Sequence, residues 1–372
     1  MRTYRTPIIS LLIVCTFGAS AQNSKKEKVQ ADTTKRITWA GIPMVNYNRS
    51  FGLLAGAMGS MYYKVNETDT ISPSSSTMLI GMYSSSKTYF LAAVQNFYLN
   101  EDRWRIKLLG GYGDVFFQFF QEIPPGIGQD LDDGIWIDFN TKVLFMQTKI
   151  QRQIIKNIYG GIEATLSDAT TTFDIKNPIT GENIRSEAQM NMVGYNLLYD
   201  SRDNVNFPVE GFFVQFSNNF VREWLGSSNN FERYKISFTH FWDISNNSKS
   251  ILASRFFGDI AAGDVPFQGE NVLGGDDLRG YSQGKYRARQ VYAIQAELRQ
   301  NLYKKFGMIA FLGVGSAVDA IGDIPNSLLL PSAGVGLRYM MIAKEKINVG
   351  IDVGVGRDDW SLTFRIGETF GR

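Results

Sequence analysis

Beyond its first twenty or so residues the chain has no long apolar run, and it consists instead of segments in which apolar and polar residues alternate. The segment from Tyr292 to Leu302 is the clearest. Its even positions are apolar except for Gln300, while its odd positions include Gln295, Glu297 and Arg299. Successive residues of a β-strand face opposite sides of the sheet, so one face of this strand suits lipid and the other a wet interior. The pattern predicts an all-β fold, an antiparallel transmembrane β-barrel.

Composition agrees with this prediction. Aromatic residues make up 13% of the chain, with 36 glycines and only 10 prolines. A mean hydropathy of -0.15 is too polar for a helical membrane protein, whereas a barrel exposes only every second strand residue to lipid. The formal net charge is only +2, so the chain lacks the basic surface that nucleic-acid binding requires.

The N-terminus is typical of a cleaved secretory signal, which we place at residues 1–21. Arg2 and Arg5 precede an apolar stretch over residues 8–17, and Ala19-Ser20-Ala21 is a small-residue cleavage site before Gln22. The apolar stretch is shorter than the roughly 20 residues that span a bilayer.

A lipoprotein signal is the alternative interpretation, because Cys15 lies within this stretch. Val14, however, stands where a small residue is expected. Residues after Gln22 are polar and charged, so we expect residues 22–41 to form a flexible periplasmic leader. Residues 42–372 then form the barrel domain.

Alternating segments bounded by turns predict about sixteen strands, an even number as in bacterial single-chain barrels. They lie near residues 42–48, 51–64, 76–85, 88–99, 103–114, 135–151, 156–167, 190–201, 209–222, 231–243, 250–261, 288–302, 306–318, 331–342, 346–356 and 359–370. A pair of soluble β-sandwiches is the alternative, but it would expose many aromatic side chains to water.

The connections predict which ends of the strands face outward. We place the long connections 115–134, 168–189 and 262–287 outside the cell, and the tight turn 303–305 in the periplasm. Residues 343–345 form another tight turn, whose side the pattern leaves open.

The segment Gly274-Gly275-Asp276-Asp277-Leu278-Arg279-Gly280-Tyr281 resembles the sixth extracellular loop of the BamA/TamA-type outer-membrane assembly barrels, the bacterial surface antigen family. That loop carries a hydrophobic residue followed by Arg-Gly-Phe/Tyr. The resemblance implies that the loop folds into the barrel and that Arg279 pairs with carboxylates on the next inner wall. Alternation puts Glu297 there, so we expect a latch of Arg279, Gly280, Tyr281 and Glu297.

Three further stretches appear in the family's order. Residues 199–204, together with Phe207, resemble the family's periplasmic turn. The residues of this turn motif are Asp200, Arg202, Asp203, Pro208 and Gly211. Asn46-Tyr47-Asn48 with Phe51-Gly52 resembles the family's opening hairpin. Residues 364–370 resemble the family's last strand, which ends in a signal with an outward aromatic residue. Here the signal residues are Phe364, Ile366, Gly367 and Phe370, and Gly371 and Arg372 follow them.

Two departures from the family stand out. Where the family commonly has an inward Asp in Phe-x-Asp-x-Gly, this chain has Gly313, so the latch is expected to depend on Glu297 alone. An ordinary salt bridge in the lumen is the alternative interpretation. The second departure is that residues 22–41 leave no room for a periplasmic POTRA domain, which resembles a short, barrel-only branch.

The sequence gives no sign of catalysis. His240 is the only histidine, and alternation puts it on the outer or interfacial face. Asp132-Asp133 and Asp276-Asp277 lie in loops, where we interpret them as solvated carboxylates because they lack the spacing of a calcium loop. No enzyme activity, metal or cofactor is expected.

The resemblance implies assembly or insertion of outer-membrane proteins without covalent chemistry. A nascent strand would add to an edge exposed at the barrel seam, and Pro43 in the first strand fits a short seam. Expected partners are outer-membrane lipid, nascent outer-membrane proteins and other envelope assembly proteins. A pore or a structural subunit of an envelope complex is the alternative.

Overall fold

The computed structural model describes residues 37–48, 52–122, 134–176 and 183–370. In these ranges the fold is almost entirely β. The strands are β1 (Ile37–Asn48), β2 (Gly52–Tyr63), β3 (Ser75–Ser84), β4 (Tyr89–Leu99), β5 (Trp104–Glu122), β6 (Gly134–Ile155), β7 (Ile158–Lys176), β8 (Asn183–Gln189), β9 (Met192–Asp200), β10 (Gly211–Val221), β11 (Phe231–Asp243), β12 (Ser250–Gly263), β13 (Asn271–Leu273), β14 (Tyr286–Ala288), β15 (Gln290–Tyr303), β16 (Phe306–Val318), β17 (Leu330–Ile342), β18 (Ile347–Gly356) and β19 (Asp359–Ile366). Three short 3-10 helices are η1 (Glu223–Leu225), η2 (Phe267–Gly269) and η3 (Ile321–Asn326).

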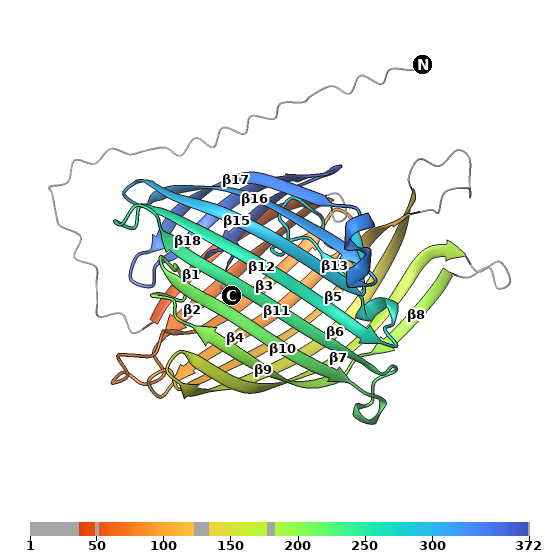
Figure 1. Cartoon of the computed structure of the whole chain (residues 1–372), viewed down its shortest axis with the longest axis horizontal. Helices are drawn as coiled ribbons and strands as arrows, with labels where there is room; N and C mark the ends of the chain where they lie inside the picture. The colour runs from red at the N-terminus through yellow and green to blue at the C-terminus, as the bar shows by residue number, and fades with distance from the viewer. Residues whose placement is uncertain (1–36, 49–51, 123–133, 177–182, 371–372) are drawn as a thin grey trace, which may run out of the picture. The chain divides into compact units, whose positions relative to one another are not determined.

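The strands form a nearly closed antiparallel barrel (Figure 1). β8 and β9 both pair with β7 and are separated only by Met190 and Asn191, so they form one interrupted strand. β13 and β14 form a separate small ribbon. The barrel therefore has sixteen strands, and the prediction of an even-numbered antiparallel barrel is confirmed.

Several predicted boundaries were wrong. The first strand begins at Ile37, so residues 37–41 belong to the barrel wall and not to a leader. The predicted loops 115–134 and 168–189 are largely strand, because β5 and β6 continue beyond their expected ends and β7 continues to Lys176 opposite β8. These long strands extend the wall on one side (Figure 1). Residues 1–36, with the expected signal, lie outside the described residues.

The barrel has two distinct rims. The start of β1, the end of β19 and the turns 303–305 and 343–346 share one rim, which we call the terminal rim. The connection 264–289 between β12 and β15 lies at the opposite rim, the loop rim, as do the ends of β5 and β7. The side of the 343–345 turn, which the sequence left open, is therefore fixed.

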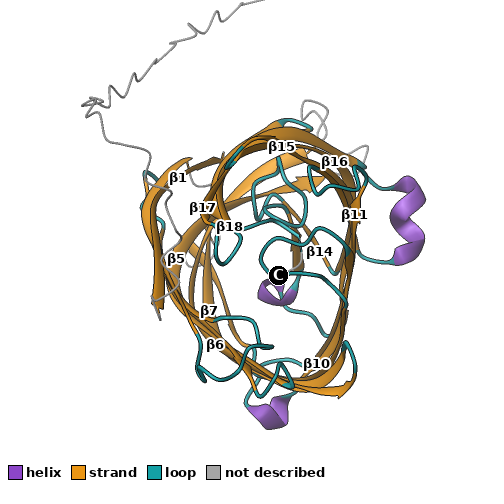
Figure 2. Ribbon diagram, turned by 90° about the vertical axis from the view of Figure 1, so that its left-hand side faces the viewer, coloured by secondary structure: helices purple, strands orange, loops and turns teal. Residues whose placement is uncertain are grey.

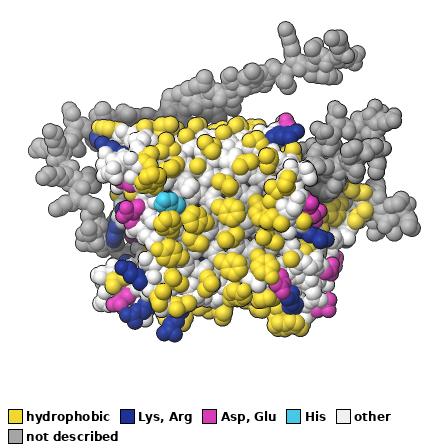
Figure 3. Space-filling model, in the orientation of Figure 1, with side chains coloured by type: hydrophobic (Ala, Val, Ile, Leu, Met, Phe, Trp, Pro, Cys, Tyr) yellow, Lys and Arg dark blue, Asp and Glu magenta, His cyan; other side chains and the backbone are white. Residues whose placement is uncertain are grey.

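The outer face of the wall is apolar. Figure 3 shows apolar side chains across the middle of one face, with charged side chains toward its two ends. Ile294 is 56% exposed and Leu337 65% exposed, as side chains that face lipid should be. His240 lies on this face and stacks on Phe212, with ring centroids 4.3 Å apart, so its predicted outward position is confirmed. In the described ranges no helix has the length and apolarity to span a membrane.

Candidate functional site: a filled lumen beside a short seam

The 264–289 connection folds into the barrel, where Figure 2 shows loop segments inside the ring of strands. Leu278 and Tyr281 are almost fully buried, at 0% and 1% exposed. They join a buried apolar cluster with Phe257 of β12 and Val291 and Ala293 of β15, which point inward. The expectation of an inward-folded loop is therefore confirmed.

Arg279, at the tip of this loop, pairs with Glu297 of β15. Its Nη1 lies 2.5 Å from Glu297 Oε2, and the side chains are 4% and 0% exposed. The guanidinium also lies over the ring of Phe311, 3.7 Å from its centroid. A charge pair this deeply buried needs such geometry, because desolvation of both ions opposes it. The structure thus brings the predicted latch residues together.

The expectation that the latch depends on Glu297 alone was wrong. Asp352 of β18 also lies close to Arg279, with its Oδ2 3.6 Å from Nη1. Gly313, where the family resemblance led us to expect an aspartate, instead leaves room for the loop. A Cβ there would lie 3.2 Å from Cδ1 of Leu278 and 2.8 Å from Cγ of Gln295. A carboxylate from another strand therefore compensates, while the glycine accommodates Leu278.

Gly280 and Tyr281 fix the loop tip against β18. Gly280 has a φ of +96°, and a Cβ there would lie 2.8 Å from the backbone of Val355. The hydroxyl of Tyr281 donates to the carbonyl of Pro331 at 2.6 Å and accepts from the amide of Arg357 at 2.8 Å. Glycine is required at position 280 by conformation and by space.

The latch belongs to a larger buried ionic network. Arg338 of β17 lies 2.5 Å from Asp352 and 3.3 Å from Glu368. Arg365 of β19 lies 2.8 Å from Asp352. Sequence analysis did not predict this network. Alternation puts Arg365 on the polar face of its strand, and the same pattern could have identified Arg338 and Asp352 as inward.

The predicted turn motif at residues 200–211 lies at the terminal rim. Asp200 accepts hydrogen bonds from Arg202 Nε at 2.7 Å and from Arg105 of β5 at 2.6 Å. Asp203 accepts from the amide of Val209 at 2.8 Å and so closes the turn. The positive φ of Gly211, +104°, starts β10 from this turn.

This turn reaches the same strand as the latch. The carbonyl of Pro208 accepts from Arg299 Nη1 at 3.3 Å, and Arg299 Nε donates to Glu297 at 2.8 Å. Two motifs that are distant in sequence therefore meet at neighbouring inward residues of β15. Together they enter the lumen from both rims.

The seam between β1 and β19 is short. Among the described residues these strands pair at a single position, Tyr47 with Leu362, whereas β1 pairs with β2 along its whole length. On the outer face Tyr47 stacks on Trp360, with centroids 4.5 Å apart. Of the predicted opening hairpin motif, Phe51 lies outside the described residues.

Past the paired position β19 departs from the wall. Ile366 is 1% exposed and shares a buried cluster with Ala40 and Met44 of β1, whose side chains face inward. Alternation points Ile366 outward from β19, as it does Phe364. The end of β19 therefore overlaps the inner side of β1.

The expected outward position of Phe370 was wrong. Gly367 has a φ of +80° and ends β19. Phe370, 2% exposed, then packs in the lumen with Phe213 and Phe241. Glu368 is held there by Asn348, whose Nδ2 donates at 2.7 Å. The alternating pattern did not reveal this turn because a single left-handed residue reverses the direction of the chain after it.

The loop aspartates are engaged in ion pairs. Asp276 lies 3.0 Å from Arg365, and Asp277 lies 2.8 Å from Arg255. Their interpretation as simply solvated carboxylates was therefore incomplete, and Asp132-Asp133 lies outside the described residues. Within the described ranges, no group of three or more acidic, cysteine or histidine residues is placed to hold a metal ion.

A sixteen-stranded antiparallel barrel with an inward arginine loop and a short seam defines an outer-membrane barrel of the assembly and transport class. The model of the Omp85 superfamily domain matches residues 126–370, more than half of the chain. The chain belongs to the Omp85 superfamily. No curated protein matches it.

Solved structures with a similar fold include BamA from Haemophilus ducreyi lacking POTRA domains 1–3, at 13% identity and a TM-score of 0.56, covering 90% of this chain and 70% of that chain. CdiB from Escherichia coli is 11% identical with a TM-score of 0.58, covering 89% and 63%. CdiB from Acinetobacter baumannii is 11% identical with a TM-score of 0.56, covering 89% and 60%. The chain thus spans less than two-thirds of the CdiB chains, and these identities show a shared fold.

Proposed function

We propose that the protein assists the folding and insertion of other outer-membrane β-barrel proteins through its β1–β19 seam. The observation that carries this proposal is the single paired position, Tyr47 with Leu362, between strands that pair fully with their other neighbours. The resemblance of the loop and turn motifs to assembly barrels supports it. Its partners would be outer-membrane lipid, nascent barrel proteins and other envelope assembly proteins.

The physical step is strand addition. Past Tyr47 and Leu362, the contact between the two strands is an apolar overlap around Ile366, so separating them breaks few backbone hydrogen bonds. The freed edge of β1 then offers backbone N–H and C=O groups in the bilayer, where unpaired polar groups are costly. An incoming strand satisfies them by β-augmentation. Pro43 lacks an N–H and limits pairing at one position.

The segments that lie inside the lumen favour this role over an open pore. The loop occupies the interior from one rim, with Arg279 3% exposed. The 200–211 turn and the residues after Gly367 occupy it from the other. A pore would require all three segments to move, whereas strand addition requires only the seam to open.

A disulfide across the seam tests the proposal. Tyr47→Cys and Leu362→Cys stand at Cα partners, whose spacing in an antiparallel pair is compatible with a disulfide. In liposomes, oxidation should slow folding of an unrelated outer-membrane protein by about tenfold, and reduction should restore it. The matched control joins Val335→Cys and Val353→Cys, Cα partners in the fully paired β17–β18 wall.

Folding is read from heat-modifiable migration and protease protection of the client, and current is recorded in parallel. Equal folding rates in oxidised and reduced seam variants would contradict the proposal. Large steady conductance without any effect on client folding would favour the pore.

A further inference from the structure

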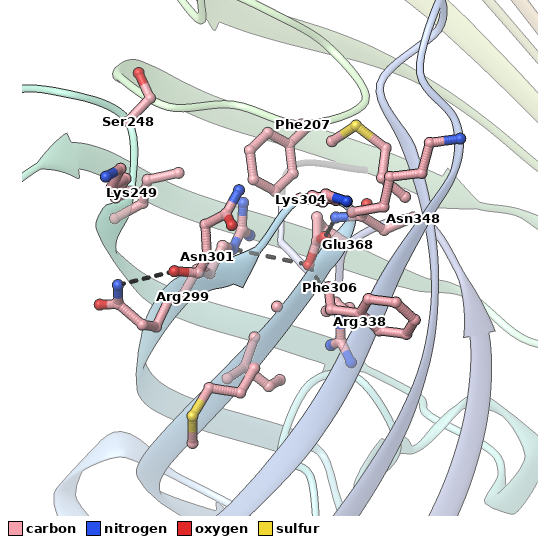
Figure 4. A pocket seen from close by; sticks show the side chains of 17 residues that line it. Phe207, Ser248, Lys249, Arg299, Asn301, Lys304, Phe306, Arg338, Asn348 and Glu368 are labelled. Atoms are coloured by element: carbon pink, nitrogen blue, oxygen red, sulfur yellow. Dashed lines mark hydrogen bonds and ion pairs between the residues drawn. The ribbon is translucent and has the colours of Figure 1, made fainter. Parts of the chain in front are cut away.

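Two neighbouring turns of the terminal rim carry a group of lysines. Lys249 comes directly before β12, and Lys304 and Lys305 join β15 to β16. These turns are neighbours because β12 pairs with β15. All three lysines line one small pocket of about 40 Å³, and Figure 4 labels Lys249 and Lys304 among the side chains around it. We call the surface formed by Lys249, Ser250, Gln300, Lys304 and Lys305 the basic sector.

The lysines are the uncompensated charges of this surface. All three are exposed, and none forms an ion pair with a residue of the described ranges. Arg299 also lines the pocket, but it is paired with Glu297. Arg338 is likewise paired with Asp352. The charge available to a ligand therefore comes from the lysines at the rim and not from the arginines of the lumen.

The carboxylates of this part of the rim lie on the lumen side. Asp203, Glu210 and Asp243 line a separate pocket together with Lys346. Asp243 accepts hydrogen bonds within its own turn, from the hydroxyl of Ser245 at 2.8 Å and from a backbone amide at 2.6 Å. None of these carboxylates belongs to the outer wall beside the basic sector, which is therefore selective for negative charge.

A polar pair lies next to the lysines on the outer wall. Gln300 is the polar exception in the outward face of β15, and its Oε1 accepts a hydrogen bond from the hydroxyl of Ser250 at 2.6 Å. Gln300 lies three residues before the end of β15, which is about 10 Å along the strand. Polar groups are costly in the hydrocarbon of a bilayer, whereas the ester layer of a leaflet can form hydrogen bonds with them.

Further from the rim the outward side chains are apolar. Leu298 is 40% exposed and lies beside Leu252 of β12. Aromatic rings flank these strands on both sides. Trp242 of β11 pairs with Leu252 and is 58% exposed, and Phe306 of β16 lies against Tyr339 of β17, with ring centroids 5.0 Å apart. Exposed aromatic residues at this position are typical of the membrane interface.

The wall therefore presents cations at the rim, then hydrogen-bonding groups, and then apolar side chains. A phospholipid has the same order of phosphate, esters and acyl chains. We propose that the basic sector binds a phospholipid with a net negative head group, in the leaflet at the terminal rim. A zwitterionic lipid fits less well, because its ammonium group would face the lysines. A soluble acidic partner would reach the lysines but not Gln300 and Leu298 in the lipid-facing wall.

The inference goes beyond the proposed function and does not depend on the seam. In the order of the sheet, β16, β17, β18 and β19 separate β15 from β1. The pocket itself is too small to enclose a head group with its glycerol, so the phosphate would lie across its mouth among the lysine side chains.

Native mass spectrometry of the full chain in detergent micelles tests this inference. The probes are dioleoylphosphatidylglycerol and dioleoylphosphatidylcholine, which have the same acyl chains. The anionic lipid should bind at least about tenfold more tightly, because each lysine near a charged head group contributes about fivefold in affinity. Added salt should reduce this preference.

Changing all three lysines to Gln should abolish most of the preference. The same three positions changed to Arg should retain it, because the positive charge is kept. Gln300→Leu should weaken binding of both lipids by a similar factor, since it removes a group that contacts the esters common to both. Unchanged or stronger binding of both lipids by Gln300→Leu would overturn the proposed order of contacts.

Lys156→Gln is the positional control, because Lys156 is an exposed lysine in the β6–β7 turn of the same rim and does not line the pocket. Heat-modifiable migration checks that every variant is folded. Equal affinity for the two lipids, or an equal loss of preference in Lys156→Gln, would overturn the inference. A ten-residue peptide of Glu serves as competitor, and its displacement of the anionic lipid would overturn the inference in favour of an acidic protein partner.

Discussion

Glu297 and Arg299, two residues apart on the inner face of β15, are joined by a 2.8 Å hydrogen bond, and each holds a different segment inside the barrel. Glu297 binds Arg279 of the inward loop. Arg299 binds the carbonyl of Pro208 in the opposite turn. The loop from one rim and the turn from the other are therefore both bound by neighbouring inward side chains of β15.

Removal of either partner of the Arg279–Glu297 pair should loosen the loop. After Arg279→Ala, Glu297 keeps Arg299, and after Glu297→Ala, Arg279 keeps Asp352. Each loss should therefore cost less than the about 3–5 kcal/mol of a buried charge left without a partner. The double variant should be less than additive, since both changes remove one shared interaction. Arg279→Lys should rescue poorly because an ammonium cannot make the two-pronged contact. Protease sensitivity of the 274–285 segment and the thermal unfolding midpoint in detergent measure the effect, and strictly additive losses would show that the two residues are not partners.

Gly280→Ala should displace the loop tip. The substitution combines a φ of +96° with a 2.8 Å approach to Val355, so it should destabilise the loop by about 1–2 kcal/mol or more. Gly322→Ala is the control, because a Cβ there meets nothing within 4 Å and its φ is not in the left-handed region. Loop proteolysis should increase for the first variant and not for the second. Equal protection of the loop from proteolysis in both variants would argue against tight packing of the loop tip on β18.

Restoring the family's aspartate with Gly313→Asp should weaken the latch. Its Cβ would crowd Leu278 and Gln295, and its carboxylate would enter a lumen that already holds Glu297 and Asp352. The unfolding midpoint should fall, and Leu278→Ala in the same chain should recover part of the loss by making room. A rise in the midpoint on Gly313→Asp alone would show that Asp352 does not replace that carboxylate.

Gly367→Ala should release the end of the chain from the lumen. The φ of +80° at this position disfavours a Cβ by about 1–2 kcal/mol. The ratio of molecules with the C-terminal segment inside the lumen to those with it outside should therefore fall by about tenfold. Phe370→Cys supplies the readout, since position 370 is buried and should react slowly with a membrane-impermeant thiol reagent until Gly367 is changed. Gly41→Ala in β1, which meets only ordinary contacts, should leave the labelling rate unchanged.

Localisation can be checked directly. Fractionated cells should contain the protein in the outer membrane, with heat-modifiable migration and a mature N-terminus at Gln22, because residues 1–21 have the pattern of a secretory signal. Recovery from the soluble periplasm would contradict the outer-membrane barrel, and an N-terminus at Met1 would contradict the cleaved signal.

The barrel wall could be predicted from sequence because lipid imposes a strict requirement on every second residue. That requirement placed Glu297 inward and Ile294 outward without any knowledge of neighbours. It holds only within the bilayer, so it missed two extensions. The extension of β7 is rich in Thr and Asp and resembles a loop, whereas that of β5 carries Phe at both odd and even positions and so does not alternate.

Residues of the site were predicted only where they lie in, or are paired by, a motif that resembles the family. Arg279 and Glu297 were matched because the family resemblance implies a pair between the loop arginine and the next inner wall, and because alternation places Glu297 on that wall. Asp352 reaches Arg279 across the lumen from a different strand, and strand alternation says which way a side chain points but not what it meets inside a filled barrel. The inward turn at Gly367 depends on one backbone dihedral angle, which periodicity does not encode.

The overlap of Ile366 with Ala40 and Met44 gives the seam a particular thermodynamic character. Separating strands that are joined by a ladder breaks many hydrogen bonds and is dominated by enthalpy. Separating an apolar overlap mainly changes the exposure of apolar surface, which carries a large heat-capacity change and weakens on cooling. The stability of this seam should therefore depend more on temperature than that of a seam closed by a ladder of backbone hydrogen bonds. It should also depend more on the lipid that can replace β1 against Ile366.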